Sequence, residues 1–206
     1  MAALVQYPNS LIEIHETWLK QSFRNRFTIL SANGPLDLNI PVTRPNGNHT
    51  KTSEVQVSHH DNPMRKIKNA VESAYKSSPY FEFFSDALNA FFDEKYTTIL
   101  EMNTASIQCM GTMLQHHFEL NFTEDFQNPD DAFAEIIDLR YELSPKNEEF
   151  NLYQAPSYYQ VFNSKFGFVS NLSILDLVMN MGTETLLYLH AYPLDHFIQT
   201  ILKKSQ

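Results

Sequence analysis

The sequence contains one cysteine, only five glycines in 206 residues, and no long hydrophobic run. The single cysteine, Cys109, excludes an intrachain disulfide and any metal site built from cysteines. It suits a reducing compartment, and we expect it to be a small core residue. No apolar stretch approaches the roughly 18 residues that a membrane-spanning helix needs, and the first residues lack the pattern of an export signal. These absences predict a cytoplasmic protein without a membrane span.

Positive charge is also scarce. Fifteen Lys and Arg residues face 24 Asp and Glu, which gives a net charge of -9 and an isoelectric point near 5.3. This is the wrong sign for binding a phosphate backbone, so we expect no nucleic-acid partner. The chain is instead rich in apolar residues, with 16 Phe and 10 Tyr. They are enough for a sizeable core, and they can equally form a homodimer surface.

Alternation of apolar and polar residues predicts strands in the first part of the chain. One strand is expected over residues 10–16, and a β-hairpin over 27–30 and 36–42, because the intervening Ser-Ala-Asn-Gly-Pro favours a turn. Residues 43–53 have almost no apolar side chains and predict an exposed loop. A short strand is expected over residues 54–59.

From Asn62 onward the apolar period becomes helical. Ser78 and Pro79 together favour the N-cap and first position of a helix. The elements expected here are helices over 63–75, 79–92 and 96–117, a strand over 117–122, an acidic helix over 129–139, a loop over 142–149, a strand over 150–154 and a helix over 174–181. The fold class is therefore α/β: a mixed sheet with an N-terminal β-hairpin and helices packed on it, in a single domain over residues 1–206.

Several strong functional signatures are missing. There is no phosphate-binding loop, no dinucleotide glycine motif, no nucleophile elbow and no His-Glu-x-x-His helix. The pairs His59–His60 and His116–His117 do not chelate alone, because neighbouring side chains diverge on a strand and lie about 100° apart on a helix. We expect no metal site, and the sequence leaves open whether the protein uses a cofactor.

A basic cluster stands out in this acidic chain. Lys20, Arg24 and Arg26 fall within seven positions, and Asn25 lies among them. Guanidinium groups match carboxylate or phosphate, and an amide completes hydrogen bonds to an oxygen-rich ligand, so the cluster predicts a site for an anionic small molecule. The alternative is a solvated strand edge, paired with the nearby glutamates.

His15 is a candidate catalytic base. It follows the first strand and has a glutamate on either side, at Glu13 and Glu16. Adjacent strand residues point to opposite faces, so pairing with Glu13 is favoured over pairing with Glu16. The alternative is a packed or exposed strand histidine without a catalytic role.

Asn171, Ser173 and Asp176 form a second candidate site at the start of the late helix. Ser173 as N-cap, with Asp176 three residues later, is typical of a capping box, and Gly182 suits the helix end. This structural interpretation competes with a functional one. The free N–H groups and positive dipole end of a helix N-terminus can hold an anion.

Two long stretches, residues 11–42 (LIEIHETWLKQSFRNRFTILSANGPLDLNIPV) and 158–182 (YYQVFNSKFGFVSNLSILDLVMNMG), closely resemble the WbqC-like proteins. The middle segments 70–84, 92–96 and 138–146 resemble the same family. The resemblance implies an association with bacterial surface-polysaccharide and O-antigen gene clusters, and with transferases of the glycine or acyl type. The family's signatures carry over to Lys20, Asn25 and Arg26, and to Asn171, Ser173 and Asp176.

The chain departs from the family pattern at its start, where a strand, a turn and a helix are expected before Leu11. One interpretation is that Met1 is an internal methionine of a longer reading frame, and that the domain lacks its first strand. The favoured expectation is a transferase of surface-polysaccharide biosynthesis that binds an anionic small molecule, such as a nucleotide sugar or an aminoacyl or acyl precursor. The alternatives are a non-catalytic binding or assembly protein, and an inactive fragment.

Overall fold

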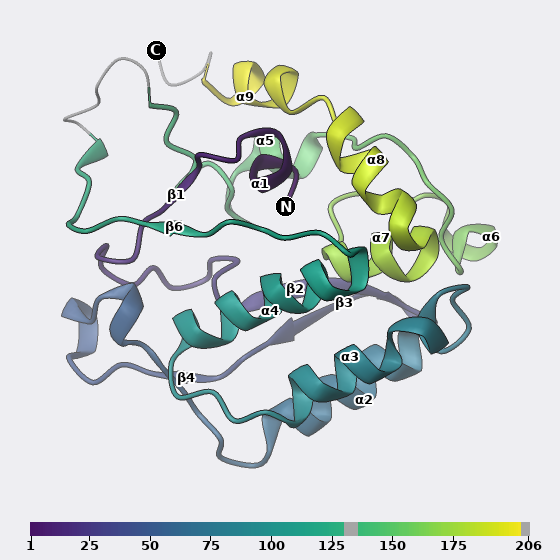
Figure 1. Cartoon of the computed structure of the whole chain (residues 1–206), viewed down its shortest axis with the longest axis horizontal. Helices are drawn as coiled ribbons and strands as arrows, with labels where there is room; N and C mark the ends of the chain where they lie inside the picture. The colour runs from purple at the N-terminus through teal and green to yellow at the C-terminus, as the bar shows by residue number, and fades with distance from the viewer. Residues whose placement is uncertain (130–135, 203–206) are drawn as a thin grey trace.

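The hairpin of residues 26–39 runs through the middle of the molecule, with the helices of residues 63–93 on one side of it and those of residues 174–191 on the other (Figure 1). The computed structural model describes residues 1–129 and 136–202. In chain order the elements are α1 (Ala2–Gln6), β1 (Leu11–Ile12), β2 (Arg26–Ser31), β3 (Gly34–Asn39), β4 (Val42–Thr43), η1 (Gly47–His49), η2 (Thr52–Glu54), β5 (Gln56–Val57), α2 (Pro63–Tyr75), α3 (Phe81–Asp93), α4 (Ile99–Leu114), β6 (Asn121–Phe122), α5 (Glu148–Leu152), α6 (Asn163–Phe166), α7 (Ile174–Met181), η4 (Gly182–Glu184), α8 (Thr185–Ala191) and α9 (Leu194–Leu202). The predicted α/β class with an N-terminal hairpin is confirmed. Within the described residues the strands form three separate pairs, β1–β6, β2–β3 and β4–β5.

The hairpin is the longest paired element of the described chain. Its register runs from Arg26 opposite Asn39 to Ser31 opposite Gly34, with a two-residue turn between. Gly34 has a φ of 108°, which a residue with a Cβ rarely adopts, so glycine is required at this point of the turn. Ile29 is fully buried because α2 and α7 both pack on β2.

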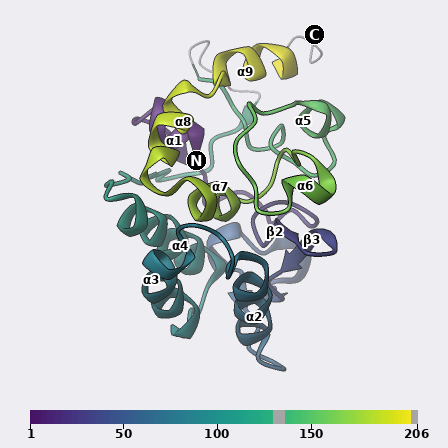
Figure 2. The same cartoon turned by 90° about the vertical axis from the view of Figure 1, so that its right-hand side faces the viewer.

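Helices α2, α3 and α4 gather at one end of the molecule, away from α8 and α9 (Figure 2). Ile67, Val71 and Tyr75 lie at a spacing of four on α2 and are buried, as the period predicts. α4 begins at a capping box: the Thr98 hydroxyl accepts from the Glu101 N–H at 3.1 Å, and the Glu101 carboxylate accepts from the Thr98 N–H at 3.4 Å. Local sequence therefore explains both helices.

The start of α3 differs from the prediction. The helix begins at Phe81, with Tyr80 at the N-cap position, and the Ser78 hydroxyl is buried without a hydrogen-bond partner. The Tyr80 N–H instead donates to the Met179 carbonyl of α7 at 3.2 Å. Because of this contact between distant segments, the helix begins two residues later than predicted.

Most residues of the segment 43–53 are exposed, as its polarity predicts, but two of its threonines are buried. Thr50 is fully buried and Thr52 is nearly so. The Trp18 N–H donates to the Thr50 carbonyl and the Thr52 N–H donates to the Glu16 carbonyl, both at 2.9 Å. Backbone pairing with residues 16–18, where Thr17 lies opposite Lys51, buries these threonines. Hydrophobic periodicity does not predict such pairing between distant segments.

Two other strand predictions are corrected. The expected strand over 10–16 is only two residues long, β1, and it pairs in parallel with β6. The expected strand over 150–154 is wrong, because α5 occupies this position and the Asn147 side chain accepts from the Phe150 N–H at its start. The expected acidic helix over 129–139 falls largely outside the described residues.

One hydrophobic core extends from Trp18 to Met179 and joins the hairpin to α2, α3, α4 and α7. A smaller cluster around Phe197 packs α9 against α1 and α5. The longest described helix, α4, has 16 residues. No helix in the described part of the chain is long and apolar enough to cross a membrane.

We predict that Gly182→Ala destabilises the protein by about 2–4 kcal/mol, because Gly182 has a φ of 59° and an added Cβ would lie 2.4 Å from the Tyr80 ring. Gly47→Ala is the matched control, since Gly47 has a φ of 58° but no atom within 4 Å of the added Cβ. We expect that variant to lose about 1 kcal/mol. Urea unfolding measures both, and equal losses would contradict the packing of Tyr80 on Gly182.

Candidate functional site

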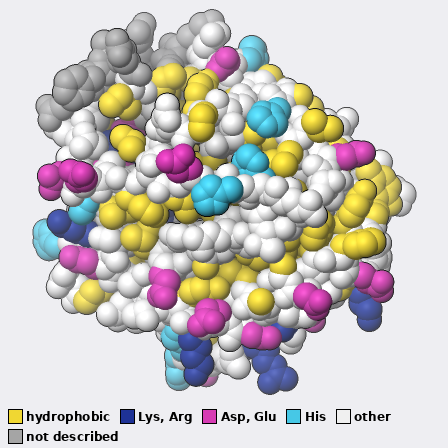
Figure 3. All heavy atoms as spheres, in the orientation of Figure 1, with side chains coloured by type: hydrophobic (Ala, Val, Ile, Leu, Met, Phe, Trp, Pro, Cys, Tyr) yellow, Lys and Arg dark blue, Asp and Glu magenta, His cyan; other side chains and the backbone are white. Residues whose placement is uncertain are grey.

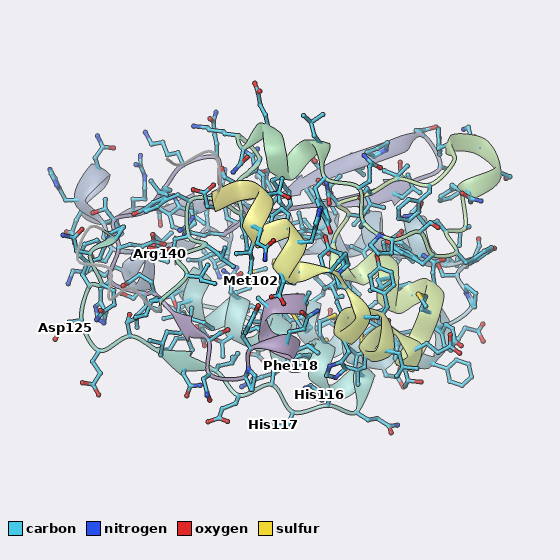
Figure 4. The ribbon with its side chains drawn as sticks, turned by 90° about the horizontal axis from the view of Figure 1, so that it is seen from above. Met102, His116, His117, Phe118, Asp125 and Arg140 are labelled. Carbon is cyan, nitrogen blue, oxygen red and sulfur yellow. The ribbon has the colours of Figure 1, made fainter. Side chains whose placement is uncertain are left out.

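A cavity of about 180 Å³ lies between the basic end of the hairpin and helices α3, α4 and α7. Most of its wall is apolar, from Phe, Leu, Ile and Met side chains. Met102 of this wall lies near the centre of the molecule, while Asp125 and His117 point outward at the edge (Figure 4). The polar or charged residues that line the cavity are Arg24, Asn25, Arg26, Asn103, Ser106 and Ser173.

The cavity brings together parts of both candidate sites. Residues 24–27 come from the start of β2, and residues 173–175 from the start of α7. The Ser173 N–H donates to the Thr28 carbonyl of β2 at 2.7 Å, which holds the two segments side by side. The Ser173 hydroxyl accepts from the Leu175 N–H at 3.3 Å, so the predicted N-cap is confirmed.

The guanidinium group of Arg24 is occupied within the protein. Its Nε donates to a Glu16 carboxylate oxygen at 2.7 Å, and a second nitrogen pairs with the same oxygen. Glu16 is only 2% exposed. Burial raises the pKa of Glu16, although the positive charge of Arg24 acts to lower it. Arg24 therefore neutralises a buried carboxylate, in an ion pair that is enclosed and not solvated.

Asn25 closes the open end of the hairpin. Its side-chain amide donates to the Ile40 carbonyl at 2.8 Å, and the Ile40 N–H donates back to the Asn25 carbonyl at 2.8 Å. Both contacts join the residue before β2 to the residue after β3. Asn25 therefore orients the β2 backbone at the point where the chain enters the cavity wall.

Arg26 differs from Arg24 in having no protein partner for its charge. Its Nε is buried without a hydrogen bond. It forms no ion pair with any carboxylate of residues 1–129 and 136–202. A buried donor left unpaired costs about 1–3 kcal/mol, and an anionic oxygen in the cavity would remove that cost. Arg26 is thus the candidate anion-binding group of this cavity.

Asp176 does not form the capping box that its spacing predicts. Its side chain accepts from the Tyr158 hydroxyl at 2.8 Å and from the Gln160 amide at 2.9 Å, and it is 1% exposed. Burial raises the pKa of Asp176, against the lowering effect of these two hydrogen bonds. The carboxylate faces this interior network and does not line the cavity.

Asn171 likewise has a partner inside the protein. It adopts a left-handed conformation with a φ of 59°, and its amide donates to the carbonyls of Phe150 and Tyr153 at 3.0 and 3.1 Å. These bonds hold the segment around α5 against the residues that precede α7. Like Asp176, Asn171 does not line the cavity.

Two other candidate residues also lie outside the cavity wall. Lys20 is exposed. The Nε2 of His15 lies 3.0 Å from the Thr123 carbonyl, and the His15 backbone N–H donates to the Glu13 carboxylate at 2.6 Å. The expected pairing of His15 with Glu13 is therefore made by the backbone and not by the ring.

Glu13 is the centre of a polar cluster that the sequence reasoning missed. Its carboxylate accepts from the Gln127 N–H at 2.8 Å, from the Thr123 hydroxyl at 3.1 Å and from the Arg140 guanidinium at 3.4 Å. Burial acts to raise the pKa of Glu13, but these bonds, with the His15 N–H, outweigh it and hold the pKa below its ordinary value. Arg140, which is labelled in Figure 4, also forms an ion pair with Asp138. The cluster joins β1 to the chain after β6.

The described residues offer no metal centre. No three His, Cys, Asp or Glu side chains come together in residues 1–129 and 136–202 in a way that could hold an ion. The His116–His117 pair lies at the edge of the molecule, after α4 (Figure 4), and the His116 ring packs against Phe118.

Helix α4 contributes cavity residues that were not identified from the sequence. Asn103, Ser106 and Cys109 lie three apart on the face of α4 that meets the cavity. The Asn103 amide donates to the Arg24 carbonyl at 2.9 Å, which aligns α4 with β2. Cys109 is half-buried, and burial raises the pKa of its thiol to about 11. In the sequence, the spacing of Asn103, Ser106 and Cys109 within an otherwise apolar helix face was the feature that could have predicted these cavity residues.

Comparison with protein families finds a match to the model described as the WbqC-like protein family, over residues 12–148. The matched region is more than half of the chain and includes the basic segment, α3 and α4, while α7 lies beyond it. Comparison with curated proteins and with solved structures finds no match.

We predict that Arg24→Leu lowers the free energy of unfolding by about 3–5 kcal/mol, because it leaves the Glu16 charge buried and unpaired. The double variant Glu16→Leu/Arg24→Leu should recover most of that loss, since it removes both charges. Urea unfolding of the two variants is the measurement. A single variant as stable as the double variant would show that Arg24 does not neutralise Glu16.

We predict that Asp176→Ala lowers the free energy of unfolding by about 2–3 kcal/mol, because Tyr158 and Gln160 lose their acceptor. Asp176→Asn keeps an acceptor and should lose less. In the unaltered protein the unfolded chain releases the Asp176 proton first, because burial raises the pKa of this group only in the folded state. Stability should therefore fall as pH rises from about 4 through the raised pKa, and Asp176→Asn should lack this contribution. Identical pH profiles for the two proteins would contradict the buried network.

Proposed function

The chain belongs to the WbqC-like protein family, and on that premise we propose that it binds an anionic small molecule as a step in bacterial surface-polysaccharide synthesis. The binding site is the cavity between β2, α3, α4 and α7. The observation that carries the proposal is Arg26, a cation at the cavity wall whose buried Nε has no partner in the protein. We place this step in the cytoplasm, where a lone thiol such as Cys109 stays reduced.

The chemistry of the cavity wall favours binding over acid–base catalysis. No His, Asp, Glu, Lys or Tyr side chain is among the residues that line it. The Cys109 thiol has a pKa of about 11 and is protonated at neutral pH. The Ser106 hydroxyl donates to the Asn103 carbonyl of its own helix at 2.7 Å, with no base beside it. The side chains of the wall thus offer recognition groups without an activated nucleophile.

A transferase is the second candidate function, and one observation favours it. Arg26 and the first residues of α7, Ser173 and Ile174, border the same cavity. A guanidinium group and a helix start on one cavity can stabilise negative charge that develops on a reacting carbonyl or phosphoryl oxygen. In this form the protein would transfer a sugar, acyl or aminoacyl group by positioning its two substrates.

We predict that Arg26→Gln weakens binding of the anionic ligand by about 10- to 100-fold, because a hydrogen bond to a charged group contributes about 1.5–3 kcal/mol. Arg65→Gln is the matched control, since Arg65 is exposed on α2 and does not line the cavity. Isothermal titration with uridine diphosphate glucose, acetyl phosphate and a short-chain carboxylate is the measurement. Equal affinities for both variants would refute the site.

Turnover separates the two candidate functions. Each compound that binds is incubated with the protein and a sugar acceptor, and the products are followed by mass spectrometry. Transfer that is lost in Arg26→Gln and kept in Arg65→Gln supports the transferase. Binding with the same Arg26 dependence, but with no product, supports the binding protein.

A further inference from the structure

We infer that the ligand of this cavity is a short-chain apolar monocarboxylate, with its carboxylate on Arg26 and its hydrocarbon chain between α3 and α4. The inference rests on the proposed function and names the class of molecule that the site takes. It is carried by the volume of the cavity, by the charges on its wall and by the apolar side chains that α3 contributes.

The volume limits the hydrocarbon part to a few carbon atoms. The cavity measures about 180 Å³. An apolar cavity of about 150 Å³ holds one benzene molecule, while pockets that enclose drug-sized ligands measure about 300–1,000 Å³. The enclosed group therefore has about six to eight non-hydrogen atoms. A nucleotide would have to remain outside.

The charges on the wall select a monoanion. Arg24 and Arg26 are the charged side chains that line the cavity, and Glu16 occupies the guanidinium group of Arg24. Among the side chains of the wall, Arg26 is left as one positive charge. Met1 also lines the cavity, and burial lowers the pKa of its α-amino group, which disfavours a second charge there. No carboxylate lines the cavity, so the ammonium group of an amino acid would be buried without a counter-charge, at a high cost in free energy. A carboxylate without an amino group avoids that cost.

The polar groups of the wall come from the hairpin end, from the start of α7 and from α4. Asn25, Arg26 and Ser173 belong to the first two segments, and the Asn103 amide of α4 donates to the Arg24 carbonyl. The residues that α3 adds to the wall are all apolar, namely Leu88, Phe91 and Phe92.

Cys109 marks the apolar end of the cavity. Its thiol donates to the Ala87 carbonyl of α3 at 3.5 Å, so it lies where α3 meets α4. Phe91 packs on Phe92 there, with ring centroids 5.1 Å apart. The hydrogen-bonding head of the ligand consequently belongs at Arg26, and its chain extends toward Cys109. The face that carries α3 and α4 shows hydrophobic side chains at the surface between these helices (Figure 3).

The first experiment measures binding of a homologous series, from acetate through butyrate, hexanoate and octanoate to decanoate, by isothermal titration to the full chain. Each added methylene that is buried should raise the affinity about fourfold, from about 0.8 kcal/mol per group. The gain should stop at about four to six carbons, because the chain and the carboxylate together then reach the six to eight non-hydrogen atoms that fill the cavity. The inference would be overturned if the affinity kept rising as far as decanoate, or if it did not rise between acetate and butyrate.

The second comparison tests the head group. Hexanoate should bind about 10- to 100-fold more tightly than hexanamide, and norleucine, which adds an ammonium group to the same chain, should bind more weakly than hexanoate. Arg26→Gln should remove the preference for hexanoate over hexanamide, and Arg65→Gln should keep it. A preference that survives in Arg26→Gln would show that Arg26 does not hold the carboxylate.

The third experiment places the chain end. In the unaltered protein, hexanoate at ten times its Kd should slow alkylation of Cys109 by N-ethylmaleimide about tenfold, because only the free form reacts. Cys109→Leu should shorten the optimal chain and should lower the affinity for hexanoate more than the affinity for acetate. Unchanged alkylation in the presence of bound hexanoate would place the chain elsewhere.

The outcomes also separate this inference from the proposed function. If no monocarboxylate binds but uridine diphosphate glucose or acetyl phosphate binds with dependence on Arg26, the inference fails and the proposed function stands. If no compound binds with that dependence, both fail.

Discussion

The site depends on one backbone hydrogen bond, from the Ser173 N–H at the start of α7 to the Thr28 carbonyl of β2, at 2.7 Å. These residues are 145 positions apart in the chain, and the bond joins the C-terminal part of the molecule to its N-terminal hairpin. It places the tip of a helix beside Arg26. The bond thereby holds in place the part of the cavity wall that Ser173, Ile174 and Leu175 form.

Burial decides which arginine of the site is free to bind a ligand. Two arginines lie two positions apart, yet Glu16 takes up the guanidinium group of Arg24 and leaves Arg26 free. A buried carboxylate such as Glu16 needs a partner, and Arg24 supplies it. The same principle explains why Asp176 is bound by Tyr158 and Gln160 and has no contact with the cavity. Arg26 remains for a ligand because the carboxylate of Glu16 pairs with Arg24.

Short-range patterns predicted the fold well wherever an element is stabilised by its own neighbours. The hairpin, α2 and the Ser173 cap of α7 follow from turn residues, apolar period and capping chemistry within a few positions of each other. The predictions failed where a distant segment decides the outcome. The first strand is short because β1 pairs with β6 over only two residues. Thr50 is buried because the backbone near Trp18 pairs with it.

The class of fold, the family and the cluster of cations in an acidic chain follow from composition, periodicity and motif order, because these are local properties of the chain. Which cation is available follows from folding, since hydrogen bonding and desolvation depend on atoms that come together from β2, α4 and α7. The cavity-facing side of α4, with Asn103 and Cys109, is likewise defined by what packs against it. A residue type can suggest a chemical role, but the role is settled by the partners that folding supplies.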